Sequence, residues 1–249
     1  MNSSIWIEVA ISDLKSSIVL YDNKNFSQSL FYFFQAIEKS TKYLGISLGI
    51  IEANRLRKDI SHETVKIFKV LIENINNNQE INSDIKLDDL NNLINSVRER
   101  SDKERAEFVL RYIKKSMNKD FPIPMENMDS PFILMINYLK SIGIKDPILE
   151  KPMSENEFKH LENVLKETSI NKILIINYAS KITMVMLVLN IFTNCYKIDD
   201  LRYPGDRIKN PNSHFDEEND YVKILPELFH IIEELMGIMK KLKWKEIRV

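Results

Sequence analysis

The amino-acid sequence predicts an all-α fold. Apolar residues recur at spacings of three and four along most of the chain, and its 249 residues include only 5 Gly and 8 Pro. No segment alternates apolar and polar residues between turn signals, as a half-buried strand would. A chain of this length can bury one large core or two modest ones, so one domain with an insertion and two separate domains are both open.

The first two predicted helices form a hairpin. Residues 5–21 carry apolar side chains at helical spacing, and the segment DNKN at 22–25 ends the pattern. A second helix is expected over residues 26–45, after a capping box formed by Asn25 and Gln28. Its sequence, FSQSLFYFFQAIEKSTKYLG, is rich in aromatic residues on one face, so we expect this helix to be central.

The middle of the chain is more charged and less regular. Ser61 is expected to cap a third helix that extends to about Ile75. Residues 84–117 predict one long helix or two shorter ones, with the solvated segment RERSDKERAE in the middle. The segment DFPIPMENMDSP at 120–131 contains three prolines and predicts a linker.

The remaining chain predicts four further helices. Two short ones, at residues 130–141 and 154–167, have clear start signals. An apolar helix at about 170–196 follows, and a long amphipathic helix at about 218–244 should be kinked by Pro226.

Composition excludes several classes of function. The net charge of −1 provides no bulk field that would attract nucleic acid or an anionic membrane. The single cysteine, Cys195, excludes an internal disulfide, and the amino terminus lacks the basic region of a secretory signal. The most apolar stretch, residues 173–192, is interrupted by Asn177, Ser180, Lys181 and Asn190 and is interpreted as a buried core helix. We therefore expect a cytoplasmic protein with no membrane association.

Metal and cofactor sites are not indicated. The four histidines show no ligand-like spacing, and no glycine-rich phosphate loop is present among so few glycines. We expect no metal and no cofactor.

Three segments then occur in a suggestive order: DLKSSIVLYDNKNFSQSLFYFFQAIEKSTKYLGI at 13–46, ISHETVKIF at 60–68 and LRYPGD at 201–206. Together they resemble the HEPN family, the higher-eukaryote and prokaryote nucleotide-binding domain. The resemblance implies an up-and-down helical bundle that commonly forms a homodimer.

The resemblance also implies a division of the chain. It covers roughly residues 5–78 and 170–244, and the stretch between them is longer than the usual connection in the family. We expect the first part of the bundle at 1–78, a helical insertion at 79–169 and the second part of the bundle at 170–249.

Four residues are candidate nucleotide ligands by this resemblance. The family pattern A-x-E-K-x-x-K falls on Ala36 to Lys42 and selects Lys39 and Lys42, and the R-Y-P loop selects Arg202 and Tyr203. If these four side chains lie close together, they would provide charge for a phosphate and stacking for a base. Two simpler interpretations stay open: a solvated helix face with an i,i+4 ion pair, and a plain turn at RYPGD.

Some family members are metal-independent endoribonucleases with an Arg-x(4–6)-His motif. Arg57 and His62 have this spacing in RLRKDISH. The arginine would stabilise charge on the scissile phosphate and the histidine would transfer protons. The small polar residue that usually follows the arginine is replaced by Lys58, so a structural role for His62 is the alternative.

Three functions follow as expectations. The first is binding of a nucleotide or RNA, or pairing with a nucleotidyltransferase-type partner in a toxin-antitoxin or defence setting. The second is a metal-independent endoribonuclease that uses Arg57 and His62 across a dimer interface. The third is a non-catalytic helical scaffold.

Overall fold

The computed structural model describes residues 4–77, 87–117 and 169–242, and these ranges contain helices and no strand. The all-α prediction is therefore confirmed. The long helices are α1 (Ser4–Asp22), α2 (Phe26–Ser47), α3 (Val65–Asn77), α4 (Leu87–Arg98), α5 (Asp102–Met117), α9 (Ser169–Thr193) and α11 (Asp220–Lys241). Three short elements complete the description: a π-helix η1 (Leu56–Ile60), a 3-10 helix η3 (Ile198–Leu201) and α10 (Pro211–His214).

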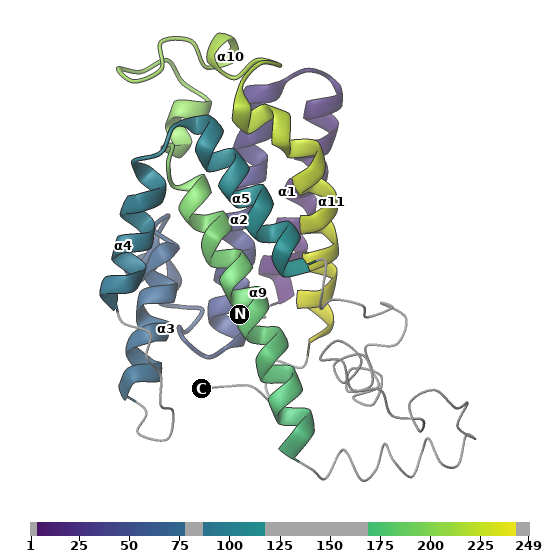
Figure 1. The fold of residues 1–249 in the computed structure, drawn as a ribbon. Helices are drawn as coiled ribbons and strands as arrows, with labels where there is room; N and C mark the ends of the chain where they lie inside the picture. The colour runs from purple at the N-terminus through teal and green to yellow at the C-terminus, as the bar shows by residue number, and fades with distance from the viewer. Residues whose placement is uncertain (1–3, 78–86, 118–168, 243–249) are drawn as a thin grey trace, which may run out of the picture.

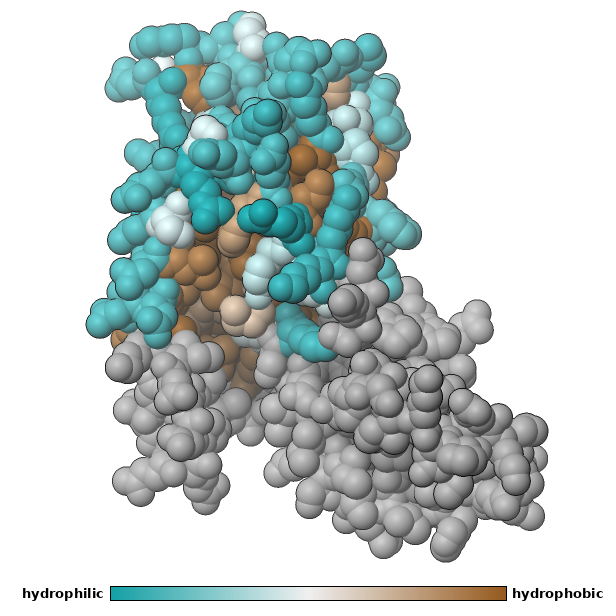
Figure 2. Space-filling model, in the orientation of Figure 1, coloured by the Kyte–Doolittle hydropathy of each residue, from teal (hydrophilic) through white to brown (hydrophobic). Residues whose placement is uncertain are grey.

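The helices form an up-and-down bundle with α2 inside it. Successive helices α4, α5, α9 and α11 alternate in direction, and η3 and α10 lie together at one end (Figure 1). The helix α2 contacts α1, α9, α11, α3 and η3, whereas α5 contacts α9 and α11. Figure 2 shows that hydrophilic side chains cover most of the described surface on one side, with hydrophobic ones visible between the helices.

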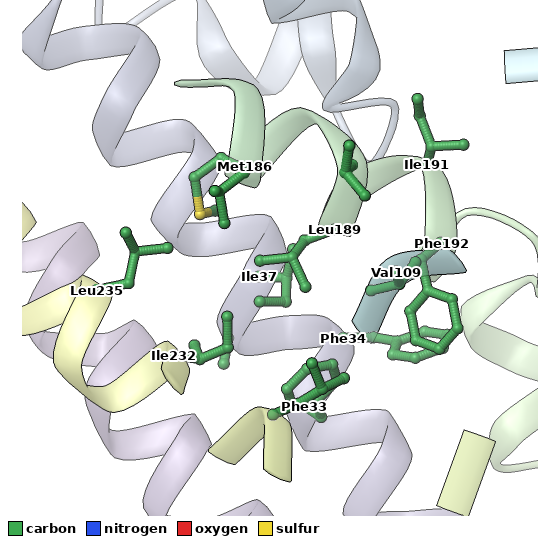
Figure 3. Close-up of a cluster of buried hydrophobic side chains, with 14 of the residues drawn as sticks. Phe33, Phe34, Ile37, Val109, Met186, Leu189, Ile191, Phe192, Ile232 and Leu235 are labelled. Carbon is green, nitrogen blue, oxygen red and sulfur yellow. The ribbon is translucent and has the colours of Figure 1, made fainter. Parts of the chain in front are cut away.

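The core is built around the aromatic face of α2, as its sequence predicts. Phe33 and Ile37 are fully buried. Figure 3 shows them facing side chains from α5, α9 and α11, namely Val109, Met186, Leu189, Phe192, Ile232 and Leu235. Burying side chains of this size stabilises the fold by about 1.5–3 kcal/mol each, so the bundle depends on α2 contacting helices from both ends of the chain.

The helix boundaries agree with the sequence predictions at most ends, with two corrections. The predicted cap at Asn25 is wrong in detail, since its side chain makes no capping hydrogen bond. The turn between α1 and α2 instead uses Lys24 at φ 60°. The predicted start of the third helix at Ser61 is also wrong, because Ser61 follows the π-helix η1 and α3 begins only at Val65.

The charged segment 84–117 forms two helices. A capping box at the start of α5 accounts for the break: the Ser101 backbone N–H donates to Glu104 Oε2 at 2.9 Å, and the Glu104 N–H donates to Ser101 Oγ at 3.4 Å. The predicted helices at 130–141 and 154–167 lie outside the described residues. Since α4 contacts α9, and α5 contacts α9 and α11, these two helices add to the same core; the predicted division at residues 78 and 169 stays a prediction.

Candidate functional site

A buried carboxylate on α2 organises the first candidate site. Glu38 is only 9% exposed, because α2 lies inside the bundle. Its Oε1 accepts a hydrogen bond from Lys42 Nζ at 2.6 Å, and its Oε2 lies 3.1 Å from His62 Nδ1. An ionised carboxylate can only accept hydrogen bonds, so Nδ1 of His62 is the donor. We call Glu38, Lys42 and His62 the Glu38 cluster.

The backbone before His62 has an unusual shape. The π-helix η1 ends at Ile60, and Ser61 follows with φ 50° and ψ −117°, a conformation that a side-chain-bearing residue rarely adopts. The His62 side chain is 70% exposed even though its Nδ1 contacts Glu38. Strained backbone and π-helices are both enriched at functional sites, so this loop is a candidate on geometric grounds.

The orientation of His62 suits proton transfer. A carboxylate that holds Nδ1–H fixes the tautomer and leaves Nε2 to accept a proton from a ligand. Arg57, the other predicted catalytic residue, belongs to the π-helix η1. Its side chain is outside the described part of the structure, so its distance from His62 stays untested.

The two predicted lysine ligands are both neutralised by carboxylates. Lys42 pairs with Glu38, is 7% exposed, and has its Nζ 5.4 Å from the ring centroid of Trp6 on α1. Lys39 forms an ion pair with Asp13 of α1. These contacts favour the structural interpretation of the two lysines, as links between α2 and its neighbours.

Arg202 and Tyr203 lie on a different part of the surface. The Ser27 hydroxyl donates to the backbone oxygen of Leu201, which ties the end of η3 to the start of α2. The guanidinium carbon of Arg202 then lies 4.6 Å from the ring centroid of Phe31 and 5.3 Å from that of Tyr203. We call Phe31, Arg202 and Tyr203 the Arg202 platform.

The Arg202 platform and the Glu38 cluster are therefore separate. Phe31 and Lys42 are eleven residues apart on α2, which corresponds to about 16 Å along the helix axis. The structure does not bring Lys42 together with Arg202 and Tyr203. The 3-10 helix η3 contacts α2 in its first turn, at Ser27, whereas the loop of residues 61–64 (the His62 loop) contacts α2 at Glu38, nine residues before the helix ends.

A third group of side chains was missed by the sequence reasoning. The hydroxyl of Tyr196 donates to Asp102, and its oxygen lies 3.4 Å from Nε2 of His214. Arg207 covers the ring of Tyr196 at 4.6 Å from its centroid and donates to the backbone oxygen of Cys195 at 3.0 Å. Burial, together with the hydrogen bond to Asp102, raises the pKa of Tyr196 well above its usual range.

A sequence signal for this third group was available. Six residues separate Arg207 from His214, which satisfies the same Arg-x(4–6)-His spacing that selected Arg57 and His62. The structure brings Arg207 and His214 to one aromatic ring, as the spacing alone could not show.

The described residues contain neither a metal site nor a membrane-spanning helix. In the described ranges, no group of three or more His, Cys, Asp or Glu side chains is arranged to hold a metal ion. No described helix is both long and apolar enough to cross a membrane.

Comparison with known proteins gives a family match over the first part of the chain. The HEPN domain model matches residues 3–119, a contiguous segment that includes α1 to α5 and therefore continues into residues we expected to be an insertion. Comparisons with curated proteins and with solved structures give no match. Residues 3–119 thus match the family that the sequence resembles, and the described residues form the all-helical bundle that this resemblance implies.

Proposed function

We propose that this protein binds RNA or a nucleotide on the Arg202 platform. The observation that carries the proposal is a difference in ion pairing among the predicted ligands. Lys39 and Lys42 are paired with carboxylates, whereas Arg202 is exposed and has no ion pair among the described residues. The family assignment supports a nucleotide- or RNA-related role in general.

The chemistry of the platform suits a stacked base next to a phosphate. Tyr203 is 55% exposed, so its ring is accessible to a base. A base stacked on an aromatic ring contributes about 1–3 kcal/mol, and a guanidinium binds phosphate oxygens through two parallel hydrogen bonds. Phe31 holds the guanidinium of Arg202 by a cation–π contact and so reduces the entropy lost on binding.

Fluorescence anisotropy with labelled single-stranded RNA tests this proposal. We expect Tyr203→Ala and Arg202→Ala each to weaken binding about tenfold or more, since a stacked base is worth about 1–3 kcal/mol. Lys209→Ala is the matched control, because Lys209 is an exposed cation of the same loop that makes no cation–π contact with the described residues. Equal weakening by Lys209→Ala would indicate attraction to charge alone and would contradict the platform.

Metal-independent RNA cleavage is a second candidate. It is favoured by the Glu38–His62 contact, which orients an exposed imidazole. Nε2 would take the proton of a ribose 2′-hydroxyl as its oxygen attacks the phosphorus, and the bond to the 5′ oxygen would break as that oxygen receives a proton from a water molecule. The products would be a cyclic phosphate and a free 5′-hydroxyl. Arg57 would stabilise the charge on the phosphate.

Cleavage of single-stranded RNA in excess chelator tests the second candidate. We expect the wild-type protein to leave cyclic phosphate ends and His62→Ala to abolish cleavage. His214→Ala is the comparison variant, because His214 belongs to the other arginine–histidine pair. If only His214→Ala loses cleavage, the catalytic site would be the group around Tyr196 and not the Glu38 cluster. Cleavage retained in both variants would remove both histidines from the mechanism.

Two expectations about partners also stay proposals. We propose a homodimer and a nucleotidyltransferase-type protein partner, both on the basis of the family assignment. Light scattering of the purified protein, with and without the product of a neighbouring nucleotidyltransferase reading frame, would test both, and a monomer in each case would contradict them.

A further inference from the structure

A buried set of polar side chains joins three distant parts of the chain next to His62. Thr41 lies on α2, Thr64 lies at the end of the His62 loop, and Asn190 lies on α9. The exposed fractions of these residues are 0%, 1% and 0%. We call Thr41, Thr64 and Asn190 the Asn190 network.

The hydrogen bonds of the Asn190 network leave little freedom. The Thr64 hydroxyl donates to Asn190 Oδ1, and Asn190 Nδ2 donates both to Thr41 Oγ1 and to the Met186 backbone oxygen, the latter at 2.8 Å. Thr41 in turn donates to the Ile37 backbone oxygen at 2.9 Å. The amide thus uses its acceptor and both donors. Because a buried polar group without a partner costs about 1–3 kcal/mol, one arrangement of these groups is strongly preferred.

Both outer members of the Asn190 network, Thr41 and Thr64, lie close in sequence to residues of the Glu38 cluster. Thr41 lies one helical turn after Glu38, and Thr64 lies two residues after His62. The loop is therefore attached to α2 twice, directly by the contact of His62 with Glu38 and indirectly through Asn190. Between η1 and Thr64 the backbone passes through the unfavourable conformation of Ser61, which surrounding contacts must maintain.

We infer that Asn190 is a positioning residue that holds His62 Nδ1 against Glu38 by fixing Thr64. The inference rests on the role proposed for His62 in the second candidate function. It also assigns a task to α9, which lies beyond the segment 3–119 that matches the family model.

Nitrogen-15 NMR of the histidine side chains tests this directly. The His62 signal is identified by its loss in His62→Ala, and a carboxylate that accepts from Nδ1 sets the neutral ring to the Nδ1–H tautomer. Thr64→Val keeps the shape of the side chain but removes its link to Asn190, and Asn190→Leu removes the whole centre of the network. We expect both variants to lose most of the Nδ1–H population of His62.

Ser40→Ala is the matched control. Ser40 is fully buried on α2 beside Thr41, and its hydroxyl has no hydrogen-bond partner among the described residues. We expect this variant to keep the His62 tautomer of the wild type. An unchanged tautomer in folded Thr64→Val would overturn the inference, even if Asn190→Leu proved too unstable to study.

The RNA assay separates this inference from the proposed function. If the wild type cleaves RNA, Thr64→Val should lower kcat about tenfold to hundredfold with little change in KM, because misplacing a catalytic group affects mainly the transition state. A tautomer change without any cleavage by the wild type would support the positioning role and contradict the ribonuclease. Cleavage with a normal kcat in Thr64→Val would contradict the positioning role alone.

Discussion

Removing the carboxylate of Glu38 should destabilise the protein more than any surface ion pair could. In Glu38→Ala the ammonium of Lys42 stays in place, and its side chain is only 9% exposed. Leaving one partner of a buried pair without the other costs about 3–5 kcal/mol. Since both side chains keep a small contact with water, we expect a value near about 3 kcal/mol, at the lower end of that range.

Urea unfolding followed by circular dichroism at pH 7 measures this change in the free energy of unfolding. The double variant Glu38→Leu with Lys42→Met should recover most of the loss, because it buries no unpaired charge. Glu63→Ala is the control: its ion pair with Lys66 has a similar length of 2.7 Å but is exposed, so its unfolding midpoint should not change.

Two results would refute this reasoning. A loss below about 1 kcal/mol in Glu38→Ala would mean that the Lys42 ammonium is well solvated without its partner. A double variant as unstable as the single one would mean that packing of the side chains, and not the unpaired charge, produces the loss.

Three further predictions use the same unfolding assay. Phe192→Ala should lower the free energy of unfolding by about 3–5 kcal/mol, because the ring is fully buried and stacks on Tyr221 with centroids 4.1 Å apart. The raised pKa of Tyr196 means that the contribution of this residue to stability should be constant below pH about 10 and should fall above it, since the unfolded chain loses the phenolic proton first. Tyr196→Phe should make that alkaline decline shallower. Gly45→Ala should destabilise despite the better helix propensity of alanine, because the new Cβ would lie 2.9 Å from Ile67 Cγ2, and an Ile67→Ala background should reduce the effect.

Local pattern was enough to predict the helices and much of the core. The spacing of Phe33 and Ile37 places them on one helix face, and α2 begins at Phe26 as the turn signal before it indicates. Helical periodicity is a property of residues three or four apart, so it can be read without knowing which helices are neighbours. The same information could not show that the ion pair between Glu38 and Lys42 would be buried.

The candidate site was predicted as residues but not as an arrangement. His62, Arg202 and Tyr203 were selected from the sequence, and the structure attaches them to different positions on α2, His62 at Glu38 and Arg202 at Phe31. Residue spacing says nothing about the rotation of one helix against another, and that rotation decides whether a lysine meets a ligand or a carboxylate. Lys39 was expected to bind phosphate, yet its partner Asp13 lies on α1, 26 positions earlier in the chain.

By itself the sequence determined an all-helical chain with its central helix, because hydrophobic spacing and turn residues act over a few positions. Only the tertiary structure decided that Glu38 holds His62, and that Asn190, 126 positions after Thr64, closes the polar network beside it. The physical reason is that a buried polar group must find a partner wherever the fold offers one, and the fold brings these partners from α9, not from neighbouring residues.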